Sequence, residues 1–125
     1  METINHECYV SLEVAKLLKE AGFDWEIKTF YFTDQLGETM LGDAKNHNFS
    51  NQFISAPTLD VAQRWLREVK NVDVFAYRNE PKDKFESIVS VNKKWSTTGM
   101  CINTYEEALE TAIKKALEMI LEKGE

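Results

Sequence analysis

Four side chains in this sequence are suited to metal binding or nucleophilic chemistry: two histidines and two cysteines. His6 and Cys8 form an H-x-C pair near the start, whereas His47 and Cys101 stand far from this pair and from each other. Imidazole and thiolate groups are the usual ligands of zinc, but a specific zinc motif repeats its cysteine or histidine pairs at a second position. One pair is weak evidence, so we expect no metal and no cofactor.

The same residues could form a cysteine–histidine catalytic pair, with Cys8 or Cys101 as nucleophile and His47 as base. Such a pair depends on reach and orientation, which the sequence does not reveal. The chain contains no glycine-rich phosphate-binding loop, no G-x-S-x-G turn and no H-E-x-x-H helix. The catalytic residues are therefore unknown. A small Cys/His-dependent enzyme or small-ligand binder stays an alternative, and a protein without enzymatic activity is the preferred interpretation.

Size and composition are those of one globular domain covering residues 1–125, with 43% hydrophobic and 29% charged residues. The 15 basic and 21 acidic residues give a net charge of −6, which disfavours a nucleic-acid partner. The opening stretch METINHECYVSLEVAKLL has no basic segment ahead of its apolar residues. It predicts neither a secretory signal nor a membrane span, so we expect a cytoplasmic protein whose two cysteines form no disulfide.

Three helices are predicted, and capping or stop residues indicate where they begin and end. The first is predicted over residues 12–21, where apolar residues recur at three- and four-residue spacing. Ser11 can cap its start, and Gly22 can adopt the left-handed conformation beyond its end, which lets Phe23 fold back on Leu18.

The second helix follows Pro57, with Thr58 as its cap and Asn71 as a left-handed stop. The third begins with a capping box of Thr104 and Glu107. Apolar stripes run along both helices, at Ala62, Trp65, Leu66 and Val69, and at Leu109, Ala112, Ile113, Ala116, Leu117 and Ile120. The starts SLEVA, TLDVA and TYEEA share a form, which we ascribe to common capping chemistry in preference to duplication of a helix–strand unit.

Strands are predicted between these helices. Alternation over residues 25–32 indicates a strand, a turn near Gly37 leads to a possible short second strand, and the remainder of residues 34–53 is predicted as a long loop. Residues 72–77 and 85–91 form a hairpin through RNEPKD, and residues 95–102 are a weaker strand candidate.

The predicted fold is therefore α+β. It is a layered sandwich in which three helices pack on an antiparallel, hairpin-built sheet. The order is α-β-(β)-α-β-β-(β)-α, with the weaker strands in brackets.

The second helix has features of a nucleic-acid-binding surface, because a tryptophan is close in sequence to three basic residues. These basic residues, Arg64, Arg67 and Lys70, are predicted on the outer face of the helix. Trp65, however, falls inside the apolar arc, which predicts a core side chain. Asp60 and Glu68 lie among the basic residues and offset their charge. A nucleic-acid accessory factor is thus a second alternative, since exposed rings beside unpaired positive charge are not indicated.

Four aromatic residues on predicted strands are candidates for an outward-facing surface: Tyr31, Phe75, Tyr77 and Trp95. Such side chains can line a pocket, form a second core layer or make a dimer contact. Among these uses, we favour self-association through a face or an edge of the sheet.

Three stretches, CYVSLEVAKLLKEAGFDWE, SAPTLDVAQRWLRE and TYEEALETAIKKALEMI, resemble small uncharacterised proteins carried by phages, prophages and other mobile elements of gut Bacteroidetes. The resemblance covers most of the chain outside residues 34–53. It implies a cytoplasmic accessory protein with a fold similar to the α/β sandwich domains of phage proteins, and it carries no catalytic residue onto this sequence. The expected function is that of a non-enzymatic interaction protein, binding itself or a phage or host protein.

Overall fold

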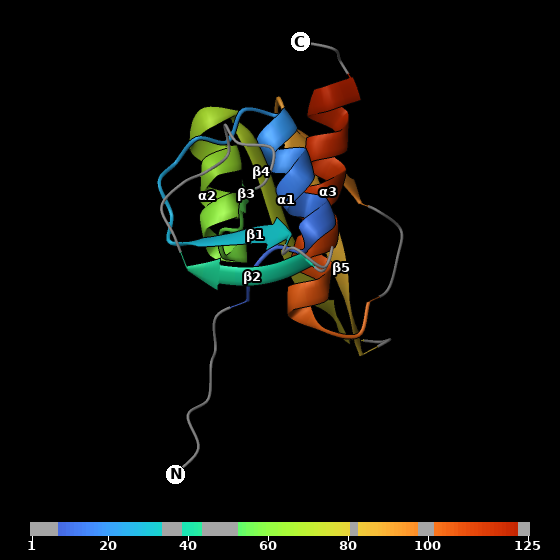
Figure 1. The fold of residues 1–125 in the computed structure, drawn as a ribbon. Coiled ribbons are helices and arrows are strands. Elements are labelled where there is room, and N and C mark those ends of the chain that lie inside the picture. Colours follow the sequence, from blue (N-terminus) through green and yellow to red (C-terminus); the bar gives the residue numbers. More distant parts are fainter. Residues whose placement is uncertain (1–7, 34–38, 44–52, 81–82, 98–101, 123–125) are drawn as a thin grey trace.

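The structure is a computed structural model that describes residues 8–33, 39–43, 53–80, 83–97 and 102–122 (Figure 1). Within these ranges the elements follow in the order α1 (Leu12–Glu20), β1 (Thr29–Thr33), β2 (Thr39–Asp43), β3 (Phe53–Ser55), α2 (Leu59–Val69), β4 (Val72–Asn79), β5 (Lys84–Val91), β6 (Lys94–Thr97) and α3 (Tyr105–Glu122). This confirms the predicted α+β class.

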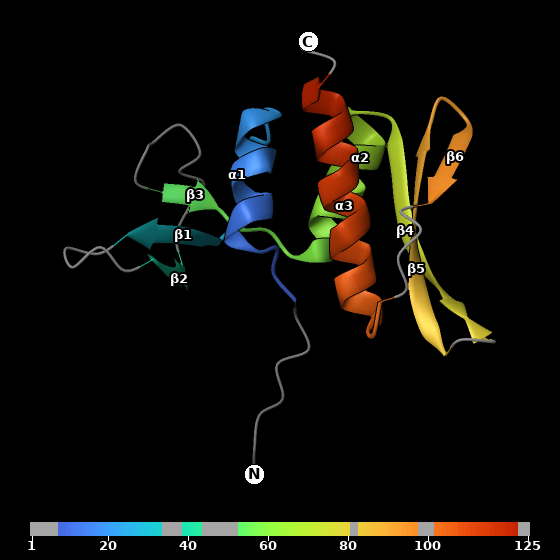
Figure 2. The same ribbon diagram turned by 90° about the vertical axis from the view of Figure 1, so that its right-hand side faces the viewer.

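The helices form a central layer between two antiparallel sheets (Figures 1 and 2). One sheet has the strand order β2-β1-β3 and lies beside α1, which contacts it through β3. The other has the order β4-β5-β6, and α2 and α3 pack against it. The sequence indicated one sheet, so the division of the strands between two sheets is a difference from the prediction.

Two further differences concern the first sheet. The strand predicted from Trp25 begins at Thr29, because Trp25 and Ile27 pack against the core from a loop and do not join the ladder. Strand β3, at the end of the region predicted as a long loop, was missed. It has three residues, and it forms by pairing with β1 over Phe32↔Phe53 to Phe30↔Ser55.

The helix starts follow the predicted capping chemistry. The Ser11 hydroxyl accepts the Val14 N–H at 3.2 Å, and the Thr58 hydroxyl accepts the Val61 N–H at 3.3 Å. Before α3, the Thr104 hydroxyl accepts a 3.1 Å hydrogen bond from the N–H of the third residue after it. Each cap satisfies an N–H that has no partner inside its helix.

The helix ends are also as expected, within one residue. Helix α1 stops at Glu20, and Gly22 adopts φ +98°. The Gly22 N–H then donates to Lys19 O and the Phe23 N–H to Leu18 O, which is the paired hydrogen bonding of a Schellman motif. Asn71, the predicted stop of α2, has φ +60° and turns the chain into β4.

A short bridge ties the starts of two helices together. The Val10 N–H donates to Pro57 O at 2.9 Å, and the Leu59 N–H donates to Cys8 O at 2.8 Å. Helix α3 joins this arrangement through Glu110, whose carboxylate accepts the Ser11 N–H at 2.7 Å. The bridge and the carboxylate set the spacing of α1, α2 and α3.

Trp65 lies in the core, as predicted, with 1% of its surface exposed. Its ring meets Phe23 edge-on, with centroids 5.4 Å apart, and the Lys70 ammonium lies 5.6 Å from its centroid. Its indole N–H is buried and has no hydrogen-bond partner among the described residues. The stabilising contribution of this residue therefore comes from apolar packing.

Replacing Trp65 with alanine should lower the free energy of unfolding by about 3 to 5 kcal/mol, because it leaves a cavity in the core. Chemical denaturation would measure this loss. Trp65→Phe should cost less, since a ring remains against Phe23 and the unpaired N–H is removed. Val69→Ala is the control on the same helix: Val69 is 50% exposed, so a change within about 0.5 kcal/mol is expected. Equal losses for Trp65→Ala and Val69→Ala would contradict the packing argument.

Candidate functional site

The sheet of β4, β5 and β6 has one face against the helices and one face turned away from them (Figure 2). Alternate residues of each strand point to opposite faces. The strand register places these residues on the helix side: Val72, Val74, Ala76, Ser87, Val89, Val91, Lys94 and Ser96. It places these on the outer side: Asp73, Phe75, Tyr77, Glu86, Ile88, Ser90, Trp95 and Thr97.

Aromatic side chains gather on the outer side, where Phe75, Tyr77, Ile88 and Trp95 form a surface that we call the aromatic face. Trp95 is 65% exposed and Tyr77 is 43% exposed. The rings of Phe75 on β4 and Trp95 on β6 meet edge-to-face, with centroids 5.2 Å apart and planes at 79°. The two rings meet across β5, whose outer-side residues Ile88 and Ser90 are buried.

A two-residue turn places Trp95 in this surface. Asn92 and Lys93 both have positive φ, at 54° and 66°, as a type I′ hairpin turn requires. The turn pairs Val91 with Lys94 and so sets Trp95 opposite Ser90. A register shifted by one residue would send the indole to the helix side.

Acidic and neutral polar groups accompany the rings on this side of the sheet. The Tyr77 hydroxyl donates to Glu86 at 2.9 Å, and the Asn79 amide donates to the second oxygen of the same carboxylate. Asp73 is exposed on the outer side of β4. A surface for single-stranded nucleic acid would need positive charge along the stacked rings, whereas this surface carries carboxylates.

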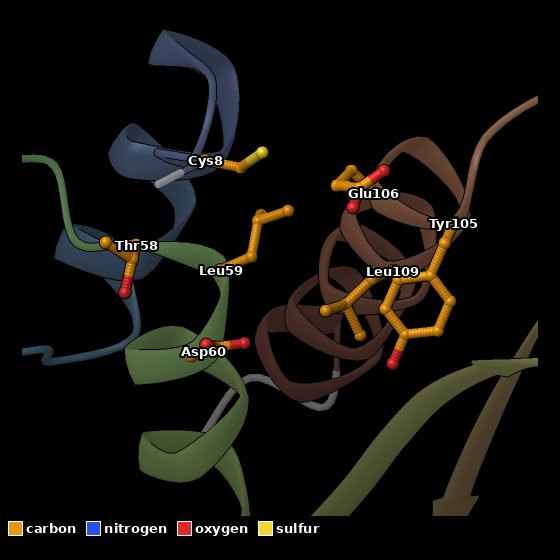
Figure 3. Close-up of a pocket in the computed structure, with 7 residues that line it drawn as sticks. All are labelled: Cys8, Thr58, Leu59, Asp60, Tyr105, Glu106 and Leu109. Atoms are coloured by element: carbon orange, nitrogen blue, oxygen red, sulfur yellow. The ribbon is translucent and has the colours of Figure 1, made fainter. Parts of the chain in front are cut away.

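Cys8 lies in a different place, at a hollow of about 250 Å³ between the starts of α2 and α3 (Figure 3). The hollow is lined by Cys8, Thr58, Leu59, Asp60, Tyr105, Glu106 and Leu109. A nucleophilic cysteine needs a base or a positive charge beside it. Among the described residues, the ionisable partners in this lining are carboxylates and a phenol, and none of them is an imidazole or carries a positive charge.

The other sequence candidates for metal or nucleophilic chemistry, His6, His47 and Cys101, lie outside the described residues. Cys8 is exposed and free. The described part of the chain contains no cluster of three or more histidine, cysteine, aspartate or glutamate residues that could hold a metal ion.

A second hollow, of about 480 Å³, lies between the start of α1 and α3. Three of the charged groups lining it have partners: the Glu110 carboxylate accepts a hydrogen bond from the Ser11 N–H, and Lys114 pairs with Glu13 at 3.0 Å. The lysine–glutamate pair raises the pKa of Lys114 through its hydrogen bond and charge. These contacts join α1 to α3 and so have a structural role.

Two of the three basic residues around Trp65, Arg64 and Lys70, contact neighbouring side chains, and the predicted offset of charge is seen at Glu68. Arg64 forms an ion pair with Glu68 at 2.8 Å, and its guanidinium lies 5.8 Å from the centroid of the Trp25 ring. Lys70 lies over the buried Trp65 ring. This face of α2 therefore lacks the exposed rings of a nucleic-acid interface.

Of the four aromatic candidates, Tyr31 lies apart from the others. It belongs to β1 and is partly buried against the core, so its predicted outward placement was wrong. Its hydroxyl donates to Val10 O at 2.8 Å, just ahead of α1. Burial, and to a smaller extent the charge of Glu110, raise the pKa of Tyr31 above 10.0.

This pKa shift gives Tyr31 a role in alkaline stability. The folded protein keeps the phenol proton at a pH where the unfolded chain has lost it, so stability present below about pH 10 is lost as pH rises through the raised pKa. Tyr31→Phe should cost about 0.5 to 1.5 kcal/mol at pH 7, through the lost hydrogen bond. It should also flatten the decline in unfolding free energy above pH 10. Parallel alkaline profiles for both proteins would contradict this role.

No protein-family model, curated protein or solved structure matches the chain. The aromatic face is accordingly assigned as the candidate functional site on its geometry.

Proposed function

We propose that this protein is a non-enzymatic accessory protein that acts by protein–protein contact, with the aromatic face as its contact surface. The observation that carries the proposal is the exposure of Trp95, at 65%, on a sheet whose opposite face is covered by helices. Clustered exposed aromatic residues are typical of interaction sites, because each ring buries a large apolar area at a small cost in conformational entropy.

The groups around the rings support a protein occupant. Tyr77 places a polar hydroxyl at the surface, held by Glu86, so the aromatic face combines an apolar centre with hydrogen-bonding groups. This combination of an apolar centre and a polar rim is the usual composition of a protein interface. The carboxylates of Asp73 and Glu86 would repel a phosphate backbone.

The first occupant that we propose is a second copy of this chain. A two-fold contact requires one surface that fits itself, and aromatic rings pack well against other aromatic rings. The resemblance noted in the sequence supports a setting in the cytoplasm, as an accessory protein of a phage or mobile element of gut Bacteroidetes. Among the described helices, none has the length and apolar character to cross a membrane.

Self-association should be measured by sedimentation velocity over a range of protein concentrations. The native protein should show a concentration-dependent dimer, and Trp95→Ser should raise the dimer dissociation constant about thirtyfold, which corresponds to about 2 kcal/mol for an aromatic interface residue. The matched control is Val69→Ser, which removes an apolar side chain that is 50% exposed on α2 and should leave the dissociation constant unchanged. A monomer at every concentration up to the millimolar range would refute self-association.

A further inference from the structure

Strand β6 is an edge of its sheet and differs from the opposite edge, β4. On β4, the Gln63 side chain of α2 donates a 2.7 Å hydrogen bond to Val74 O, so a side chain covers part of that edge. Along β6, every residue from Lys94 to Thr97 is exposed. An uncovered edge strand presents backbone groups that can pair with another strand.

The hairpin geometry determines which groups are available on β6. In a hairpin closed by a two-residue turn, the residues flanking the turn exchange hydrogen bonds, and such pairs then alternate along the ladder. Val91↔Lys94 and Val89↔Ser96 are the hydrogen-bonded pairs by this rule, given the register. Trp95 therefore directs its N–H and C=O away from β5, and Thr97 does the same.

We propose that two copies of this chain join through β6, in an antiparallel pairing about a two-fold axis at Ser96. Trp95 of each copy then lies opposite Thr97 of the other, and the two sheets become one. Because Trp95 and Thr97 are on the outer side, the two aromatic faces become continuous across the junction. This inference rests on the proposed self-association and places the contact between the copies at the β6 edge of the aromatic face, where Trp95 lies.

The register follows from the groups that must be paired. Centring the axis on Ser96 lets the outward-directed groups of Trp95 and Thr97 pair with each other. Centring it on Trp95 would place Thr97 opposite Lys93, whose positive φ is incompatible with a strand. Centring it on Thr97 would leave Trp95 opposite a residue beyond the end of β6.

The charge distribution favours a second copy over an unrelated acidic or basic strand. Lys93 and Lys94 are exposed at the β5–β6 turn, and Lys94 lies on the helix side of the sheet. At the opposite end of the sheet, the Phe85–Tyr105 ring contact holds the start of α3, where Glu106 is exposed. Antiparallel pairing brings the lysines of each copy towards the acidic helix start of the other, and this opposes the repulsion between two chains of net charge −6.

Disulfide trapping tests this register. Opposed residues at a non-hydrogen-bonded antiparallel position have Cα atoms about 4.5 Å apart, within reach of a disulfide. Ser96→Cys, in a chain with Cys8→Ser and Cys101→Ser, should form a covalent dimer under mild oxidation at least tenfold faster than Arg67→Cys in the same background. Arg67 is the control because it is exposed on α2, away from β6.

A proline variant tests the backbone pairing directly. Thr97→Pro removes an N–H that points away from β5, a position where edge strands tolerate proline. It should raise the dimer dissociation constant at least tenfold relative to Thr97→Val, which keeps the N–H, while both variants retain the melting temperature of the native protein. Rapid trapping at residue 96 together with this loss would support the pairing.

The outcomes separate this inference from the proposed function. A native dimer that persists in Thr97→Pro, with slow trapping at residue 96, would overturn the β6 pairing and leave self-association through the aromatic face in place. A native monomer throughout the concentration range, with no preferential trapping, would overturn both.

Discussion

Burial of the apolar stripe of α3 is the constraint on which the other elements depend. Five residues of this stripe are buried, and so is the neighbouring Ala108: Leu109, Ala112, Ile113, Ala116 and Leu117. Its alanines are small, so neighbouring elements can approach the helix axis closely. Strand β5 lies close enough to α3 for the Ser87 hydroxyl to donate a 2.5 Å hydrogen bond to the carbonyl oxygen of Ala108. Helix α3 contacts α1 and α2 as well as β4 and β5, and it therefore occupies the centre of the layered structure.

The same constraint explains why a sheet face is left uncovered. The helices form one layer between the two sheets, so they can cover only the inner face of each (Figures 1 and 2). On the sheet of β4, β5 and β6, the aromatic residues of the outer face partly shield one another: Phe75 and Trp95 pack edge-to-face, whereas Trp95 keeps 65% of its surface in solvent. The fold thus leaves the aromatic face exposed, because none of the described helices covers it.

The features that could be predicted from the sequence are those set by local physics. The caps at Ser11, Thr58 and Thr104 depend on hydrogen bonds within one helical turn. The positive φ angles of Gly22 and Asn71 depend on the conformational freedom of these residue types. The separate sheet of β1, β2 and β3 depends on tertiary pairing. Strand β3 has three residues and little periodicity of its own, and the alternation that begins at Trp25 comes from packing of a loop on the core.

The candidate site was predictable to the extent that it, too, follows local rules. Period-two alternation places Phe75 and Tyr77 together, and the two-residue turn carries this alternation from β5 into β6. The openness of the β6 edge could not be inferred in this way, because it depends on where α2 lies. Gln63 reaches β4 because α2 packs beside that strand, and β6, which continues from the far side of β5, lies beyond its reach. The placement of one helix therefore makes the two edges of the sheet chemically different.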